Sequence, residues 1–358
     1  MSKIGNFFKE LALLPFVNAA LTIAGVLAGY LGSHYDKRIS DSMMSLVFVP
    51  GTSFDLAVTM FWLVLLVFFA CLTGTAWAQK QSEDALNGEF KESLRALFTM
   101  PAKGFLQRYQ NISLTSTNFI WSLPSTLPPA QLEQAIRIQL VSICNVVKEY
   151  DGPGSTATYG CNVMLFVPVG SGFFAANQAP LQARLKCIEA GVAITNLAGV
   201  LDLQLKLSIS SSSSSAPDPT LTPLALPIPH ATLNSAGQTQ YDQVVPGAPY
   251  AFASERELVF ANQQQLIDEV ATNRGFSTTV LRELEALLGP QSAHVQSLIC
   301  IPLFAAPQTG ATSPPQPIGV LNIHKSETDA HAASKFEYLS PLLTPLVQNL
   351  GNLVEQVQ

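Results

Sequence analysis

Charged side chains are scarce in this chain. Only 12% of its 358 residues are charged and 48% are apolar, whereas a soluble protein usually has about 25% charged residues. The deficit predicts either a large core or a segment that lies in lipid. No block of lysine and arginine is present, and the net charge is −6. We therefore expect no direct binding to nucleic acid, which needs a basic patch.

The sequence also lacks the common catalytic motifs. It contains no G-x-x-x-x-G-K-[ST], no G-x-S-x-G, no H-E-x-x-H and no protein-kinase signature. We therefore expect that the protein is not an enzyme, with an enzyme of unrecognised type as the alternative. Without a catalytic output, the protein must act through the membrane, through its oligomeric state or through a separate partner.

Metal-binding patterns are missing too. No cysteine belongs to a C-x-x-C pair or has a histidine at metal-ligand spacing. The cysteines are Cys71, Cys144, Cys161, Cys187 and Cys300. Small buried thiols in a reducing compartment are the simpler interpretation. His324 and His331 could form a metal pair with Asp329, but nothing completes the ligand set, so a capping or surface role is favoured.

Two long uncharged runs lie near the N-terminus, at residues 11–33 and 56–78. About 20 apolar residues are enough for a helix to cross a hydrocarbon core of about 30 Å. The second run carries Trp62 and Trp77 toward its ends, and aromatic residues favour the membrane interface. Both runs are longer than the apolar part of a cleaved signal peptide. We therefore predict a two-helix transmembrane hairpin within residues 1–80.

The charges around these runs indicate an orientation. Lysine and arginine residues precede the first run and follow the second, and such residues favour the cytoplasmic side. They are Lys3, Lys9, Lys80, Lys91 and Arg95. We expect a two-span protein of the bacterial inner membrane, with both termini and the large C-terminal part in the cytoplasm.

Gly25 and Gly29 form a G-x-x-x-G motif within the first run. Small residues at this spacing let helix backbones approach closely in lipid. The motif predicts a packing face, either for the second helix or for another protomer, and a homo-oligomer is therefore expected. The alternative is an incidental cluster, because glycine and alanine are common in membrane helices.

Residues 81–127 are predicted to be a helical connector. Within it, Glu83–Met100 has an apolar and a charged side, and the helix should end before Pro101. Such a helix could carry a signal from the membrane to the rest of the chain. It could equally be a spacer.

The part of the chain after the connector begins with a helix and two strands. Helical spacing of apolar residues predicts a helix over Pro129–Tyr150, and strands are predicted over Cys161–Val169 and Val200–Ser210. Residues 170–199 lie between the two strands, and residues 211–244 follow the second strand. The latter segment starts with a run of serines followed by prolines, a composition that predicts a flexible surface loop.

Two short apolar strands and a long helix close the chain. The strands lie in the stretches SLICIPLF and PIGVLNIHKSE, the second strand being GVLNI with His324 in the loop after it, and the helix spans Lys335–Gln358. They contain a PL…G.L.I pattern made by Pro302, Leu303, Gly319, Leu321 and Ile323. This order resembles the C-terminal half of a GAF domain, a small-molecule sensor and dimerisation module. The resemblance covers residues 128–358 and implies an α+β fold, a GAF-like antiparallel sheet flanked by helices, preceded here by the transmembrane hairpin. A minimal GAF domain is shorter, so the resemblance implies insertions at about residues 170–199 and 211–244.

The resemblance also suggests where a ligand would bind. In GAF domains the ligand lies on one face of the sheet, under the segment between the third and fourth strands. That segment would be Tyr250–Gln296, with the third strand in Ser254–Ala261. The polar candidates for ligand contact are Arg256, Asn262, Arg274 and His294. The arginines could bind the phosphate of a nucleotide, or all four could be solvated surface residues, and no cofactor is specified.

Two function hypotheses follow. In the first, the GAF-like domain receives a signal, from a ligand or from a partner protein, and the hairpin perturbs the inner membrane. This plan resembles prokaryotic antiphage effectors, which disrupt the membrane after activation by a nucleotide messenger or partner complex. In the second, the hairpin only tethers a GAF adaptor or signalling scaffold, and a separate signalling or defence protein supplies the output.

Overall fold

The structure is a computed structural model in two compact units, Met1–Leu97 and Phe98–Gln358. It describes residues 15–34, 36–37, 39–40, 59–70, 72–74, 76–77, 80, 83–84, 100–152, 155–211, 216–233, 237, 239–240, 243–272, 276–306 and 316–357. The predicted helix over Glu83–Met100 falls almost wholly outside these residues.

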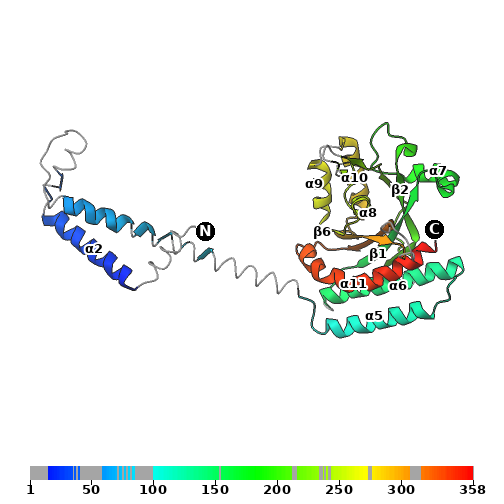
Figure 1. Ribbon diagram of the computed structural model, residues 1–358, viewed down its shortest axis with the longest axis horizontal. Coiled ribbons are helices and arrows are strands. Elements are labelled where there is room, and N and C mark those ends of the chain that lie inside the picture. The colour runs from blue at the N-terminus through cyan, green and yellow to red at the C-terminus, as the bar shows by residue number, and fades with distance from the viewer. Residues whose placement is uncertain are drawn as a thin grey trace. The chain divides into compact units, whose positions relative to one another are not determined.

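The first unit is a pair of helices packed side by side (Figure 1). Helix α2 (Pro15–His34) lies against the helical residues 59–70. A Cβ added at Gly25 would lie 3.5 Å from Phe68, and one added at Gly32 would lie 3.6 Å from Phe61. The earlier glycine meets the later phenylalanine, so the two helices run antiparallel. No helix among the described residues is both long and apolar enough to cross a membrane.

The second unit has the predicted α+β class, with an antiparallel sheet and flanking helices. Its helices are α5 (Phe105–Ser122), α6 (Pro129–Asp151), α7 (Gly172–Arg184), η1 (Ile194–Asn196), α8 (Ala248–Ser254), α9 (Gln263–Thr272), α10 (Thr278–Gln291) and α11 (Ala332–Glu355). Its strands are β1 (Tyr159–Pro168), β2 (Gly199–Ser210), β3 (Ala225–Ile228), β4 (Thr232–Leu233), β5 (Thr239–Gln240), β6 (Leu258–Phe260), β7 (Ser297–Phe304) and β8 (Pro317–Lys325).

Six of the strands form one sheet in the order β3-β2-β1-β8-β7-β6, and β4 pairs with β5 separately. The first strand therefore lies beside the last, at the centre of the sheet. In this central pair Asn162 is opposite Asn322 and Gly160 is opposite His324. Both strands are almost fully buried, which explains why their sequences are apolar on both faces.

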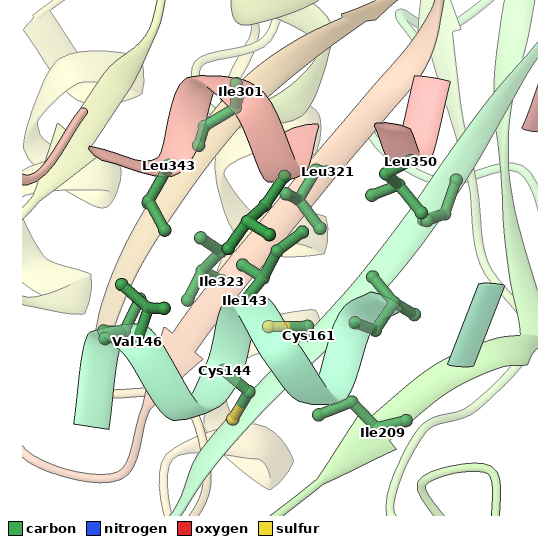
Figure 2. Close-up of a cluster of buried hydrophobic side chains, with 14 of the residues drawn as sticks. Ile143, Cys144, Val146, Cys161, Ile209, Ile301, Leu321, Ile323, Leu343 and Leu350 are labelled. Carbon is green, nitrogen blue, oxygen red and sulfur yellow. The ribbon is translucent and has the colours of Figure 1, made fainter. Parts of the chain in front are cut away.

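Helices cover both faces of the sheet (Figure 1). On one face, α6 and α11 pack on the strands and α5 packs on these two helices, and together they form the larger apolar core. Figure 2 shows part of this core, where Ile143, Cys144 and Val146 of α6 meet Cys161, Ile209, Ile301, Leu321 and Ile323 of the sheet and Leu343 and Leu350 of α11. On the other face, α8, α9 and α10 form a second core with the alternate residues of the same strands.

A buried polar chain joins the three helices of the larger core. Ser116 of α5 donates a hydrogen bond of 2.6 Å to the Gln139 side-chain carbonyl of α6. The amide nitrogen of Gln139 donates to the carbonyl oxygen of Leu346 in α11, at 3.0 Å. Ser116 and Gln139 are fully buried, and a buried polar group without a partner costs about 1–3 kcal/mol. The chain therefore fixes how these helices sit against one another.

An ion cluster closes one end of the sheet. Asp151, at the end of α6, binds Lys325 of β8 at 2.8 Å and Lys335 of α11 at 2.9 Å. The Tyr159 hydroxyl also donates to Asp151, and Asp329 binds Lys335. Burial alone would raise the pKa of Asp151, but the hydrogen bonds from Lys325, Tyr159 and Lys335 outweigh it and lower that pKa below 3.8. The cluster thus holds two helices to the central strands.

Several elements differ from the expectations set by the sequence. Residues 225–228, expected in a flexible loop, form the buried edge strand β3, because the run ALPI is apolar enough to pair with β2. The strand expected over Ser254–Ala261 is only β6, because Ser254 ends helix α8 and Glu255, in a left-handed conformation, turns the chain after it. The connector contributes a helix, α5, that apolar spacing had not identified. All four cysteines that the structure describes are free and buried, as expected.

Replacing Gln139 with leucine should destabilise the second unit by about 1–3 kcal/mol, because Ser116 would lose its buried acceptor. Chemical denaturation followed by circular dichroism measures the effect. The control is Gln134→Leu on the exposed side of α6, which should change stability by less than about 0.5 kcal/mol. Adding Ser116→Ala to Gln139→Leu should restore part of the loss. Equal stability of the Gln139→Leu and Gln134→Leu variants would contradict the role of the buried hydrogen bonds.

Candidate functional site

A cavity of about 100 Å³ lies between the sheet and the covering helices α8, α9 and α10. Leucines, valines, one methionine, an alanine and a proline make up most of its wall, and no charged side chain lines it among the described residues. The polar side chains in the wall are those of Asn162, Asn322, His324 and Gln291. A mostly apolar cavity with a few convergent polar groups is the usual form of a small-molecule site.

His324 is the most unusual of these polar residues. It is 4% exposed, and its Nδ1 lies 3.3 Å from the carbonyl oxygen of His294. A carbonyl oxygen can only accept, so Nδ1 carries the proton and Nε2 is left as an acceptor. Nε2 is buried and has no hydrogen-bond partner in the part of the chain that the structure describes. A buried imidazole is therefore left with one unsatisfied acceptor.

The pKa of His324 is lowered from its ordinary value of 6.5. Burial is the main cause, because it disfavours the charged imidazolium. The hydrogen bond to the His294 carbonyl and the charge of Asp218 act in the opposite direction, and the His294 side chain lowers the pKa further. His324 is therefore neutral at pH 7, as an accepting Nε2 requires.

Asn162 and Asn322 form a buried amide pair across the two central strands. The Asn322 nitrogen donates to the Asn162 oxygen at 2.9 Å. The Asn322 side-chain oxygen is buried and has no partner among the described residues. Two acceptors, Asn322 Oδ1 and His324 Nε2, are thus unpaired on one face of β8. Each costs free energy until a hydrogen-bond donor binds it.

Gly160 leaves room for the His324 ring. A Cβ added at Gly160 would lie 2.3 Å from Cε1 and 2.4 Å from Nε2 of that ring. Contacts this short do not occur, and the ring is buried, so it could not move aside cheaply. The glycine on β1 is therefore part of the site, because it lets the imidazole lie flat across the neighbouring strand.

A second cavity, of about 350 Å³, adjoins the first. The two share the side chains of Leu221, Leu287, Gln291 and Val295. The second cavity is also lined by Lys186, Thr220, Glu283 and His294, so its wall is polar and charged. The first is called the inner cavity and the second the outer cavity; they share part of their wall and differ in its polarity.

Comparison with protein-family models, with curated proteins and with solved structures finds no match for this chain.

The four residues that the sequence suggested for ligand contact do not lie together in the structure. Arg256 is exposed after α8, and Asn262 accepts a hydrogen bond from the Gln265 backbone at the start of α9, where it acts as a helix cap. Neither lines the inner or the outer cavity. Arg274 lies outside the described residues. His294 lines the outer cavity and supplies the carbonyl that fixes His324.

The two glycines of the G-x-x-x-G motif also differ from each other. Gly25 faces Phe68, whereas a Cβ at Gly29 would meet nothing within 4 Å. The metal alternative for His324 and His331 receives no support from their positions. Asp329 binds Lys335, His324 faces the cavity, and among the described residues no group of three or more histidine, cysteine or acidic side chains could hold a metal ion.

Sequence reasoning missed Asn162 and Asn322 and did not place His324 in the cavity. A signal was nevertheless present. In VLNIH, polar residues occupy alternate positions of a strand whose other residues are apolar. In a strand that is buried on both faces, alternate polar residues must point into the interior on one side. Buried polar residues need partners, so such a pair indicates a site.

Gly160→Ala should displace the His324 ring and destabilise the unit by about 1–3 kcal/mol. The measurement is thermal unfolding of the full chain, with the side-chain resonances of His324 as a local readout. Gly170→Ala is unsuitable as a control because its φ is +93°. Gly172→Ala is suitable, since nothing lies within 4 Å of its added Cβ. Unchanged His324 resonances in Gly160→Ala would contradict the contact.

Burial of neutral His324 should make stability fall as the pH drops through 6.5. The unfolded state takes up a proton there and the folded state does not, so the free energy of unfolding decreases by up to about 1.4 kcal/mol per pH unit. His324→Phe should remove this slope. The control variant His230→Phe, at an exposed residue, should keep this pH dependence of stability. Melting temperatures between pH 7.5 and 5.5 test this, and identical slopes in both variants would contradict it.

Proposed function

We propose that the protein is a membrane-anchored sensor-effector. The N-terminal helix pair inserts into the inner membrane, and the C-terminal GAF-like unit binds a small molecule in its inner cavity. Binding changes the arrangement of protomers, and the helices then perturb the bilayer. The exposed apolar surface of the N-terminal helix pair is the observation that carries this proposal.

That surface includes residues of both helices. Val26 of α2 is 68% exposed and Leu66 on the partner helix is 70% exposed. Other large apolar side chains exposed on this unit are Ile23, Leu27, Tyr30, Met60, Leu63, Val67, Phe69, Leu72 and Trp77. Soluble monomers rarely expose apolar patches of this extent. Lipid would cover these side chains at no cost, and the uncharged runs at 11–33 and 56–78 are long enough to reach across it.

The element order of the second unit supports its assignment as GAF-like. A helix and two strands come first, a helical segment from α8 to α10 follows, and a strand pair leads into the closing helix α11. The inner cavity lies under that helical segment, where the resemblance places a ligand. A ligand that binds one arrangement of protomers more tightly would shift the population toward it.

The alternative is a membrane-tethered adaptor whose output is a separate protein. One observation favours it. Helix α5 exposes Leu106, Leu114 and Trp121, and Trp121 is 81% exposed. A helix that is already packed on α6 and still shows such side chains has an apolar surface that a signalling or defence partner could cover. The membrane anchor is common to both functions, so the experiments below test anchoring and output separately.

Leu66→Arg should weaken membrane integration of the full chain. A charge near the centre of a membrane helix costs about 2.5–3.5 kcal/mol on insertion scales. The measurement is flotation of bacterial membranes after carbonate extraction. The control is Leu233→Arg, at a residue that is 65% exposed in the second unit, and it should float like the unmodified chain. Recovery of the unmodified chain in the soluble fraction would contradict the anchor itself.

Variants at Gly25 and Gly29 can distinguish helix packing within one chain from helix packing between protomers. On induced expression, the effector function predicts propidium uptake, which deletion of residues 1–80 should abolish. Gly25→Leu should reduce uptake by forcing α2 away from Phe68. Gly29→Leu has free space within one chain, so a loss of uptake in that variant would indicate contact with another protomer. Membrane-bound protein with normal growth and no dye uptake, even with the inner cavity occupied, would favour the adaptor.

A further inference from the structure

We infer that the inner cavity selects an uncharged ligand that presents an N–H or O–H donor on a small apolar ring. This inference rests on the proposed sensing function and specifies the ligand class. It starts from the two unpaired buried acceptors, His324 Nε2 and Asn322 Oδ1. Both belong to residues that line the cavity, and both are more than nine-tenths buried.

The hydrogen bonds already present determine that the ligand must donate. The proton of the His324 ring is committed to the His294 carbonyl, so the remaining nitrogen can only accept. The Asn322 nitrogen donates one of its two N–H groups to Asn162, and the Asn322 oxygen is left without a donor among the described residues. A ligand that offers only acceptors would leave His324 Nε2 and Asn322 Oδ1 unpaired, at a cost in affinity.

The charges around the cavity exclude an ion. No arginine or lysine among the described residues lines the inner cavity, so an anion would be buried without a counter-charge. Asp218 is buried nearby and acts on the charge of His324, but it does not line the cavity, and its Oδ1 accepts from the Thr220 backbone and hydroxyl at 2.9 and 2.7 Å. A cation would therefore also lack a carboxylate in the described part of the wall. Phosphate-bearing nucleotides do not fit this site.

The volume limits the buried part of the ligand to one small ring. An apolar cavity of about 150 Å³ holds one benzene, and the inner cavity here is about 100 Å³. The volume therefore favours a ring no larger than benzene, such as a five-membered ring, as the buried part of the ligand. Any larger or more polar part of the ligand would extend into the outer cavity, beside Lys186 and Glu283.

Three probes of the same ring size test this class. Pyrrole carries one N–H donor and no charge, furan has the same shape without the donor, and pyrrole-2-carboxylate adds a negative charge. The full chain is labelled with ¹⁵N-histidine and placed in lipid nanodiscs. Each probe is then titrated into this sample. The chain has five histidines, so the Nε2 resonance of His324 can be assigned by the His324→Phe variant and followed directly.

We expect pyrrole to bind about tenfold more tightly than furan, which is the effect of one hydrogen bond, and to shift the Nε2 resonance of His324. Pyrrole-2-carboxylate should bind less tightly than pyrrole. His324→Phe should equalise pyrrole and furan, whereas the matched variant His230→Phe should keep the difference. Asn322→Leu provides a second test at the other acceptor and should also reduce the preference for pyrrole. The comparison of probes on the unmodified chain does not depend on how any variant folds.

Other results would overturn the inference. Equal binding of pyrrole and furan would show that the cavity takes apolar molecules without reading a donor, and the sensing function would stand with a different ligand class. Tighter binding of the carboxylate would point to an anion. If no probe binds at millimolar concentration, the ligand class is wrong. Failure of the anchoring function would instead be seen in the flotation experiment, which is independent of these probes.

Discussion

The pairing of β1 with β8 is the constraint on which the second unit depends. It places the first strand of the sheet beside the last, so the chain between them must leave the centre and return to it. The ion cluster around Asp151 lies at one end of this pair and holds α6 and α11 to it. Because these contacts join distant parts of the chain, they carry a large loop-closure cost and should form late in folding.

The same strand pair supplies the polar wall of the inner cavity. Gly160 and Asn162 come from β1, and Asn322 and His324 come from β8. Neighbouring residues of these strands point to the opposite face and into the larger core that Figure 2 shows. The candidate site is therefore part of the most constrained segment of the unit. A site built on central strands is held more accurately than one built on loops.

Sequence patterns predicted the fold in outline because its main elements have clear periodicity. Helix α6 and strands β1, β2, β7 and β8 were expected close to their observed bounds. Strand β3 was missed because four apolar residues in a serine- and proline-rich segment are too few to show a period. Helix α8 was not predicted, since a seven-residue helix that is buried on most sides carries little helical periodicity.

The candidate site was harder to predict because its residues act through three-dimensional pairing. Arg256 looked suitable for a ligand by its chemistry, but it is exposed and lines neither cavity. Asn162 and Asn322 are distant in sequence and become a pair only through the β1–β8 register. The unpaired acceptor of His324 depends on a backbone carbonyl at His294, which no side-chain pattern could reveal.

The uncharged wall of the inner cavity has a consequence for how a sensor would behave in a cell. Salt screens interactions between charges and has little effect on a hydrogen bond made in an apolar enclosure. Occupancy of such a cavity would follow ligand concentration alone, at nearly the same threshold in dilute and in concentrated salt.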